Sequence, residues 1–438
     1  ADDYEIGHSL RFDGSASNMS RGNLGTPTSL TTSTLSVWVK RSKLDATTRI
    51  YSVQGTGSCE GGLHFTSTNK LKVYMNDTGC TGDGGTFTTA AVYRDTSAWY
   101  NIVISIDTTD STANDRMKVY VNGERVTDFS ASVNFGSGAT VYWNSTAQAQ
   151  QGRLGQQGGG GYLDGYLAEV NYVDGQALAP TAFGETGTYG EWKPIEYSGS
   201  YGNIGWYLNF ATAADMGDDK SGNGHDWTES NIAATDQMLD SPTNNFCNWN
   251  VVDKIGGTLS EGNLKFVAGS STRVRGTMAV SSGKWYWETC RTTIESGYHS
   301  GIAVEGYDND SLGNNDHAYQ VYAGTYLYAK PNGIAGGNLL WGAGTANDII
   351  QVALDMDNRK IWFGKNGTWY NSGNPATGAN ATTTILATHN GATPLSVGNA
   401  GTTVHNFGQD SSFAGNKTAQ GNTDGNSIGD FYYAPPTG

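Results

Sequence analysis

Paired carboxylates are the first candidates for chemistry in this sequence. Asp355-Met-Asp357 and Asp308-Asn-Asp310 each carry two carboxylates at alternating positions. On one strand face such a pair comes close to the roughly 5–5.5 Å separation that retaining glycoside hydrolysis requires. Both pairs lie in turn sequence, however, and Asp164 and Glu169 fall on opposite faces of their strand by parity. The sequence therefore predicts no catalytic residues and no enzyme.

A cluster of aromatic residues is the strongest sequence signal for ligand binding. Sugars stack their apolar ring faces on aromatic side chains, while nearby polar groups bind the hydroxyls. Tyr322, Tyr326 and Tyr328 share one strand face on a period of two, and Trp341 and Trp369 lie close by in the chain. These five residues are the candidates for a ligand-binding platform. Packing in the sandwich core or against another subunit is the favoured alternative.

Metal and phosphate chemistry have weak support. The loop Asp218-Asp-Lys-Ser-Gly-Asn-Gly-His-Asp-Trp227 is dense in oxygen atoms that suit Ca²⁺, but the same residues form tight turns, and the plain turn is favoured. The four glycines at 158–161 are followed by no Gly-Lys-Ser/Thr, so a flexible loop is favoured over a phosphate-binding loop. We expect no cofactor and no metal centre.

The four cysteines give no zinc-binding pattern. Cys59 and Cys80 lie in Gly-rich loop sequence of one domain, so either a disulfide joins them or both are free thiols. The other two, Cys247 and Cys290, lie in the second half of the chain.

Two hairpins of the same type organise the chain. In the second half, the strands of residues 349–355 and 360–365 lead into Asn366-Gly367, and both residues of this dipeptide accept the positive φ of a type I′ turn. In the first half, the strands of residues 100–106 and 117–121 lead into Asn122-Gly123. The repeated pattern predicts two all-β domains of related architecture.

Alternation in the strand Leu35-Ser-Val-Trp-Val-Lys-Arg41 predicts one buried and one exposed face. Val37 and Val39 share the first face, and Trp38 and Lys40 share the second. Residues 191–247 are irregular, with many turn residues, and 414–438 are rich in Gly and Asn. We therefore expect a β-sandwich over 1–190, a coil-rich junction over 191–247, a second sandwich over 248–413, and a C-terminal segment.

The composition agrees with an all-β fold and excludes several functions. The chain has 438 residues with 61 glycines, 24 tyrosines and 12 tryptophans, and only 15% of its residues are charged. The formal net charge of −15 argues against nucleic acid as a partner. No apolar run approaches a membrane span, so no membrane insertion is expected. The N-terminal sequence ADDYEIGHSL lacks the regions of a secretory signal.

Two ordered sets of motifs each resemble a known family. LSVWVKR, the WYNIVISI…KVYVNGERV hairpin and DGYLAEVNYVDGQAL resemble laminin-G-like domains of the concanavalin-A-like jelly-roll superfamily over roughly residues 8–185. GKWYWE, SGIAV, NDIIQVALDMDNRKIWFGKNG and a terminal NFG resemble the SPRY domain over about 248–413. The second resemblance implies a β-sandwich whose loops bind partners without chemistry.

The tandem of these modules, with the RFDGSASNMSR opening and the DQMLDSPTNNF junction, resembles virion proteins of tailed bacteriophages, particularly marine ones. The resemblance implies a non-enzymatic structural or adhesion protein on the virion surface, in a tail fibre, a tailspike or a capsid decoration. Expected partners are other virion proteins, further copies of this chain and host-surface polysaccharide. The alternatives are a polysaccharide-depolymerising tailspike enzyme and a secreted bacterial lectin.

Overall fold

The computed structural model describes residues 3–22, 25–55, 59–76, 83–144, 151–293, 298–307, 317–322, 326–329, 334–339 and 344–437. For residues 83, 326, 328, 329 and 334–339 it describes the backbone alone. The chain divides into two units, Ala1–Asn245 and Phe246–Gly438. Nearly every element is a strand, and the described helical segments are single 3-10 turns, so the predicted all-β class is confirmed. No helix among the described residues has the length and apolar character needed to cross a membrane.

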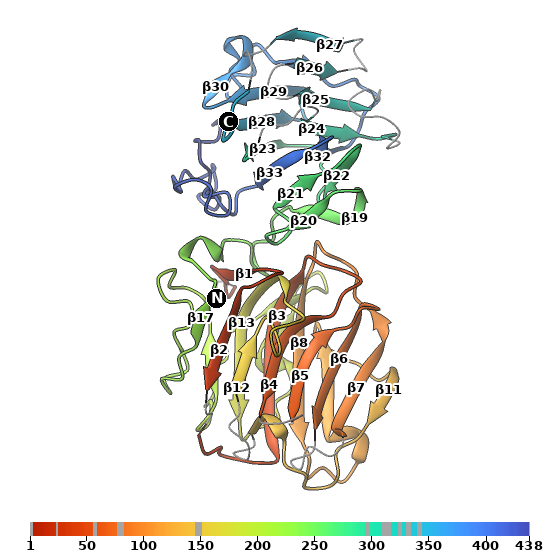
Figure 1. Cartoon of the computed structure of the whole chain (residues 1–438), viewed down its shortest axis with the longest axis vertical. Helices are drawn as coiled ribbons and strands as arrows, with labels where there is room; N and C mark the ends of the chain where they lie inside the picture. The colour runs from red at the N-terminus through yellow and green to blue at the C-terminus, as the bar shows by residue number, and fades with distance from the viewer. Residues whose placement is uncertain are drawn as a thin grey trace. The chain divides into compact units, whose positions relative to one another are not determined.

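Two antiparallel sheets form the first unit (Figure 1). In spatial order, the first sheet contains β10 (Glu124–Arg125), β9 (Met117–Val121), β8 (Trp99–Asp107), β3 (Thr32–Arg41), β13 (Asp164–Asp174), β1 (Ser9–Asp13) and β18 (Gln237–Met238), with β16 (Trp206–Leu208) paired to β13. The second contains β11 (Phe129–Val133), β7 (Asp83–Val92), β6 (Lys70–Asn76), β5 (Glu60–Phe65), β4 (Thr48–Gln54), β12 (Gln151–Leu154), β2 (Asn18–Gly22) and β17 (Thr228–Ser230).

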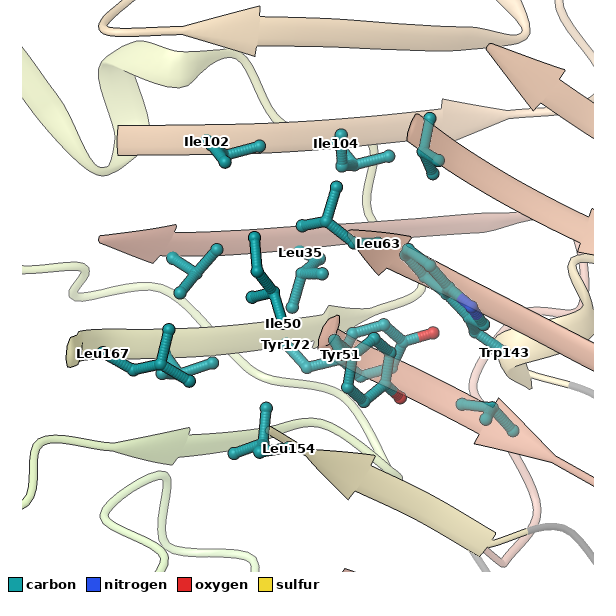
Figure 2. Close-up of a cluster of buried hydrophobic side chains, with 14 of the residues drawn as sticks. Leu35, Ile50, Tyr51, Leu63, Ile102, Ile104, Trp143, Leu154, Leu167 and Tyr172 are labelled. Carbon is teal, nitrogen blue, oxygen red and sulfur yellow. The ribbon is translucent and has the colours of Figure 1, made fainter. Parts of the chain in front are cut away.

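Apolar side chains from both sheets meet between them to form the core of this unit. Figure 2 shows the cluster, with Leu35, Ile102, Ile104 and Leu167 from the first sheet and Ile50, Leu63 and Leu154 from the second. Trp143, in the 3-10 turn η2 (Tyr142–Asn144), packs edge-on against Tyr51 with ring centroids 5.1 Å apart. The alternation of strands supplies this core, because every second residue points between the sheets.

The central strand β3 of the first sheet is buried on both faces, which differs from the predicted half-exposed strand. Val37 and Val39 point into the core, as expected, but Trp38 and Lys40 on the other face are also buried. Residues after β13 return across this outer face: Phe183 and Tyr201 pack on Val103 and Val173 there. The prediction was wrong because a strand's alternation shows which residues share a face, whereas the covering segment lies far away in the sequence.

A β-bulge in β13 overturns the parity argument for Asp164 and Glu169. The register against β3 shifts between Ala168 and Asn171, and Glu169 has a φ of 49°. Leu167 and Val170 therefore both point into the core. Beyond the bulge Glu169 directs its carboxylate to the outer face, where the Tyr207 hydroxyl donates to it. The two acids share a face because one extra residue reverses the alternation.

The segment predicted as a junction contributes strands to the first unit. β16, β17 and β18 pair with β13, β2 and β1, and the two strands β14 (Gly184–Thr186) and β15 (Trp192–Pro194) form a separate ribbon. The described residues also form the 3-10 turns η1 (Ala113–Asp115), η3 (Pro180–Ala182), η4 (Ala234–Asp236) and η6 (Tyr370–Ser372), the last of these in the second unit.

Of the cysteines, Cys59 is disulfide-bonded. Cys247 and Cys290 are buried and form no disulfide, and Cys80 lies outside the described residues.

The second unit is also a pair of antiparallel sheets (Figure 1). One sheet contains, in order, β19 (Trp249–Ile255), β22 (Thr272–Gly276), β32 (Ala392–Gly398), β24 (His299–Val304), β25 (Ala318–Tyr322), β26 (Tyr326–Ala329) and β27 (Ile334–Leu339). The other contains β20 (Thr258–Ser260), β21 (Lys265–Ala268), β33 (Gly401–Asn406), β23 (Lys284–Arg291), β28 (Ile349–Asp355), β29 (Lys360–Lys365) and β30 (Thr368–Trp369), with β31 (Thr383–Thr384) paired to β29.

Both predicted hairpin turns are present. Asn122 and Gly123 have φ values of 50° and 79°, and Asn366 and Gly367 have 50° and 82°. Positive φ at both central residues is the condition for a type I′ turn, which matches the twist of the flanking strands. The dipeptides therefore set the register of β9 with β10 and of β29 with β30.

The C-terminal segment packs on the second sheet of the second unit. Tyr432 and Tyr433 pack against a buried cluster of Cys290, Ile349, Val404 and Phe413. Backbone N–H groups of Tyr432 and Tyr433 donate to the carboxylate of Glu288, a residue of β23 with no exposed surface, at 2.8 and 2.7 Å. This segment therefore forms part of the unit's structure.

Candidate functional site

The face of the second sheet that points away from the core of the first unit carries polar side chains. We call it the polar face and define it by Arg49, Ser52, Glu60, His64, Lys72, Tyr74, Thr86, Arg153 and Gln157. Local sequence explains it: Leu63 and Phe65 enter the core and leave His64 outside, and Leu71, Val73 and Met75 do the same for Lys72 and Tyr74. The strands β4, β5 and β6 lie side by side in Figure 1 and bring these residues together.

A chain of hydrogen bonds crosses the polar face. Nη1 of Arg49 donates to the Tyr74 hydroxyl at 2.9 Å, and that hydroxyl donates to Oε1 of Gln157 at 2.7 Å. The Gln157 amide then donates to a carboxylate oxygen of Glu60. Every link runs in one direction, from a guanidinium to a carboxylate. Because such a chain polarises its own members, it holds these side chains in fixed positions.

The protonation state of His64 follows from its neighbours. Burial, together with the charges of Arg49 and Lys72, lowers its pKa to about 3, so the ring is neutral at pH 7. Nη1 of Arg49 lies 3.1 Å from Nδ1 of His64. Because a guanidinium can only donate, Nδ1 must accept and Nε2 carries the ring proton. His64 thus presents an N–H donor without adding charge.

Three cations give the polar face a positive character in a chain of net negative charge. Nζ of Lys72 lies 5.1 Å from the ring centre of Tyr74, and Cζ of the Arg49 guanidinium lies 5.6 Å from the same ring centre. Arg153 lies on β12, the strand next to β4, and is paired through the backbone with Ser52. Among the described residues, no ion pair includes Arg49, Lys72 or Arg153. These charges remain available to an acidic ligand.

Close packing leaves little room for a side chain at Gly62, in the centre of the polar face. A Cβ at Gly62 would lie 3.0 Å from the Tyr51 carbonyl oxygen and 3.2 Å from the Tyr74 ring. Next to Tyr74 across the strands, Thr86 is 8% exposed, and its hydroxyl has no hydrogen-bond partner among the residues that the structure describes. A buried hydroxyl without a partner is costly unless a ligand or water satisfies it. The glycines at 158–161 border this region: the carbonyl oxygen of Gly161 accepts from the Arg49 backbone.

Of the five aromatic residues predicted as a platform, Tyr322, Tyr326 and Tyr328 lie on neighbouring strands of one sheet, and Trp369 lies on the other sheet. Tyr322 is half-buried on β25 and packs on His299, with ring centroids 4.8 Å apart. Tyr326 pairs with it from β26, and Tyr328 pairs with Gln320, but the side chains of both tyrosines lie outside the description. Trp341 lies outside the described residues. Trp369 belongs to the other sheet, where its ring packs against that of Tyr286 with centroids 6.4 Å apart. Their role in binding stays a prediction.

Two of the carboxylates considered for hydrolysis, Asp355 and Asp357, accept hydrogen bonds from protein donors. The side chain of Asp355 accepts from the backbone and the side-chain amide of Asn358, at 2.8 and 2.9 Å. Asp357 accepts from the backbone of Gly283 at 2.9 Å. Both acids therefore stabilise turns. The Asp308-Asn-Asp310 sequence lies outside the described residues.

The loop at 218–227 forms a tight turn around Asp219, as its Asn, Asp and Gly residues predict. The carboxylate of Asp219 accepts from the backbone of Tyr207, Ser221 and His225 and from the Ser221 hydroxyl, at distances between 2.8 and 2.9 Å. Both of its oxygens thus bind protein donors. Among the described residues, no group of three or more His, Cys, Asp or Glu side chains could hold a metal ion.

Sequence reasoning missed the polar face. The signal was present in the alternation of residues 63–65 and 71–75, which assigns His64, Lys72 and Tyr74 to the outer face. Alternation does not say which strands are neighbours, however. Arg49, Glu60 and Gln157 join the group only because β4 pairs with β5 and the loop after β12 returns beside them.

Comparison with known families supports the fold of the first unit. Residues 13–181 match the model of the concanavalin A-like lectin/glucanases superfamily. The match lies wholly within the first unit and includes the strands of the polar face. No curated protein matches the chain.

Solved structures of low identity are similar to parts of the chain. The SPRY domain of human HERC1 is 18% identical, with 36% of this chain and 96% of that chain covered and a TM-score of 0.30. A putative carbohydrate binding protein from Bacteroides ovatus is 13% identical, covering 52% and 61%, with a TM-score of 0.35. Domain 4 of an extracellular arabinanase from Geobacillus stearothermophilus, in complex with arabinotriose, is 17% identical, covering 41% and 76%, with a TM-score of 0.30.

Similarity at these TM-scores carries no argument about function, and the SPRY assignment of the second unit stays a prediction. The chain is an all-β protein whose first unit is similar, over residues 13–181, to the concanavalin A-like lectin and glucanase superfamily.

Proposed function

We propose that the first unit binds carbohydrate through its polar face, without catalysis, and that its ligand is a glycan with acidic sugars. The observation that carries this proposal is the network from Arg49 through Tyr74 and Gln157 to Glu60. Fixed donors and acceptors of both kinds suit sugar hydroxyls, which donate and accept at the same atom.

Acidic sugars follow from the charges. Arg49, Lys72 and Arg153 supply three cations, and Glu60 is the one carboxylate among the side chains described on this face. Charge-assisted hydrogen bonds from guanidinium groups to carboxylates are stronger than neutral ones. A uronic acid or a sulfated sugar would therefore bind more tightly than a neutral oligosaccharide of the same length.

The test is calorimetric titration of the full chain with acidic and neutral oligosaccharides. Arg49→Gln should weaken binding of the acidic ligand about tenfold or more, because a hydrogen bond to a charged group contributes about 1.5–3 kcal/mol. Tyr74→Phe keeps the ring and removes the hydroxyl of the network. Arg125→Gln is the matched control, since Arg125 is an exposed cation on β10 of the other sheet. Equal affinity of Arg49→Gln and the unmodified chain would reject the proposal.

The absence of catalysis has its own test. Retaining hydrolysis needs two carboxyl groups about 5–5.5 Å apart. Glu60 has no described carboxylate beside it on this face and accepts a hydrogen bond from Gln157. Incubation with an acidic polysaccharide should release no reducing ends, whereas release that Glu60→Gln abolishes would establish the alternative, a depolymerising enzyme.

The setting we propose is the surface of a tailed-phage virion, where the chain would contact other virion proteins and further copies of itself. This part rests on the sequence resemblance of the tandem modules, the RFDGSASNMSR opening and the DQMLDSPTNNF junction. Electron microscopy of particles labelled with an antibody to this chain would test it. Labelling of a secreted bacterial fraction, with none on particles, would instead favour the secreted lectin.

A further inference from the structure

The outer face of the first sheet holds a buried lysine that contacts an aspartate and an asparagine side chain. Lys40 lies on β3, and neither its side chain nor that of Asp240 has any exposed surface. Its Nζ lies 2.7 Å from Oδ2 of Asp240 and 2.7 Å from Oδ1 of Asn245. All three residues belong to the first unit. We propose that they form an autocatalytic modification site, in which Lys40 and Asn245 become joined by an isopeptide bond.

The amine and the carboxamide are already held in contact. Because Cγ of Asn245 is bonded to the oxygen that Nζ touches, the attacking nitrogen lies beside the carbon it would attack. The other end of the carboxamide is also fixed, since its Nδ2 donates to the carbonyl oxygen of Ser97 at 2.8 Å. Reacting atoms held at about 3–3.5 Å gain the rate advantage of an intramolecular reaction.

Asp240 is placed to move the protons. Its Oδ1 accepts from Nε1 of Trp99 at 3.0 Å, and its Oδ2 contacts the lysine. Transfer of a proton from the Lys40 ammonium to this carboxylate leaves both groups neutral, which removes the cost of two buried charges. An amine attacks a carbonyl carbon only in its neutral form. Asp240 thus acts as the base that creates the nucleophile.

The reaction balances without a further reagent. Nζ of neutral Lys40 bonds to Cγ of Asn245. As the bond from Cγ to Nδ2 breaks, one amine proton of Lys40 and the proton held by Asp240 pass to Nδ2. The products are a secondary amide and ammonia. Ammonia leaves with the proton that Lys40 carried at the start, as ammonium, and Asp240 returns to its carboxylate form. No atom is oxidised or reduced.

The arrangement favours Asn245 over Asp240 as the acyl group. A bond to Asp240 would release water and would consume the carboxylate that accepts the lysine proton. Asn245 is exposed to solvent, so the ammonia that it releases can leave the protein. The bond would tie the last residue of the first unit to β3, which lies between β8 and β13 in the sheet.

Intact mass spectrometry of the full chain, reduced and denatured, tests the proposal. Reduction removes any contribution from the Cys59 disulfide. The expected mass is lower than the sequence mass by one ammonia, and a protease digest should contain one branched peptide with Lys40 and Asn245. Asn245→Ala and Lys40→Arg should each restore the full mass of the variant sequence. Asn244→Ala, at the neighbouring asparagine, should keep the deficit.

The contrary results are equally specific. A mass equal to that of the sequence overturns the proposal, as does a deficit that persists in Asn245→Ala, which a succinimide at Asn122-Gly123 would give. Loss of one water in place of ammonia would assign the bond to Asp240. Asp240→Asn should lack the branched peptide, and retention of that peptide would remove Asp240 from the reaction. Because Asn245 is exposed, its alanine variant keeps the test valid if the Asp240 variant fails to fold.

Discussion

The hydroxyl of Tyr207 donates to both carboxylate oxygens of Glu169, at 2.8 Å to Oε1 and 2.7 Å to Oε2. Glu169 sits in the bulge of β13, with a positive φ, and the Tyr4 hydroxyl also donates to it at 3.1 Å. Burial raises the pKa of Glu169 to about 7, although the hydrogen bonds from Tyr207 and Tyr4 oppose that rise. A glutamate that titrates near neutrality makes the stability of the first unit depend on pH.

The sign of this dependence follows from the raised pKa. The folded state binds the proton more tightly than the unfolded state, whose reference value is 4.5. The stabilising contribution is therefore complete below about pH 4.5 and is lost as pH rises through about 7, by about 3 kcal/mol in total. Glu169→Gln should remove this loss, so its melting temperature should exceed that of the unmodified chain increasingly from pH 5 to pH 8.

Glu185→Gln provides the control for that experiment, because Glu185 is an exposed acid in the same unit. It should leave the pH profile of the melting temperature unchanged. A profile of Glu169→Gln parallel to that of the unmodified chain would show that Glu169 does not titrate in this range.

Acid should destabilise the second unit through His405. The ring is buried, and its Nδ1 and Nε2 contact the hydroxyls of Thr289 and Thr403, each at 2.9 Å. Burial lowers the pKa of His405 to about 3 from 6.5. Because the unfolded state then binds the proton more tightly, stability is complete above about pH 6.5 and falls as pH decreases toward 3, by up to about 5 kcal/mol.

His405→Gln keeps a polar side chain and removes this titration. Its free energy of unfolding, measured with urea, should fall less between pH 6.5 and pH 4 than that of the unmodified chain. Substitution of His225, which is partly exposed, is the control. An equal fall in the His405 variant would contradict the prediction.

Glu288 should anchor the C-terminal segment of the second unit. Besides the two backbone donors of Tyr432 and Tyr433, it accepts from the Tyr286 hydroxyl at 2.8 Å. In Glu288→Gln the amide group must face one of these donors, and a buried donor left without an acceptor costs about 1–3 kcal/mol. Hydrogen exchange should accelerate at residues 431–433, while exchange in β24 stays slow. Glu305→Gln, an exposed acid of the same unit, should show no change, and unchanged exchange in Glu288→Gln would refute the anchor.

The two type I′ turns should respond unequally to the same substitution. Valine at Gly367 would hold a β-branched residue at positive φ, which costs about 1–3 kcal/mol. Valine at Gly123 carries the same strain, and its Cβ would also lie 2.5 Å from the ring of Trp192. At Gly367 the nearest atom is 3.0 Å away, on the ring of Tyr433. Gly123→Val should therefore lower the melting temperature more, and an equal or reversed order would contradict the described packing.

The sequence by itself determined the fold class and the local turns. Alternation placed Val37 and Val39 together in the core, and the Asn-Gly dipeptides marked both hairpins, because these signals depend on neighbours within a few residues. Local chemistry also favoured the tight turn around Asp219 over a calcium site, since Asn, Asp and Gly stabilise such turns without an ion.

Only the tertiary structure decided what covers each face. Lys40 reads as an exposed lysine from its strand alone, yet Asp240, two hundred positions later, buries it. The bulge at Glu169 depends on the pairing of β13 with β3, which alternation cannot show. The polar face has the same origin: Arg49, Tyr74 and Gln157 are ordinary outward residues until strand pairing makes them neighbours. Long-range pairing and burial depend on the whole chain, and no short pattern contains them.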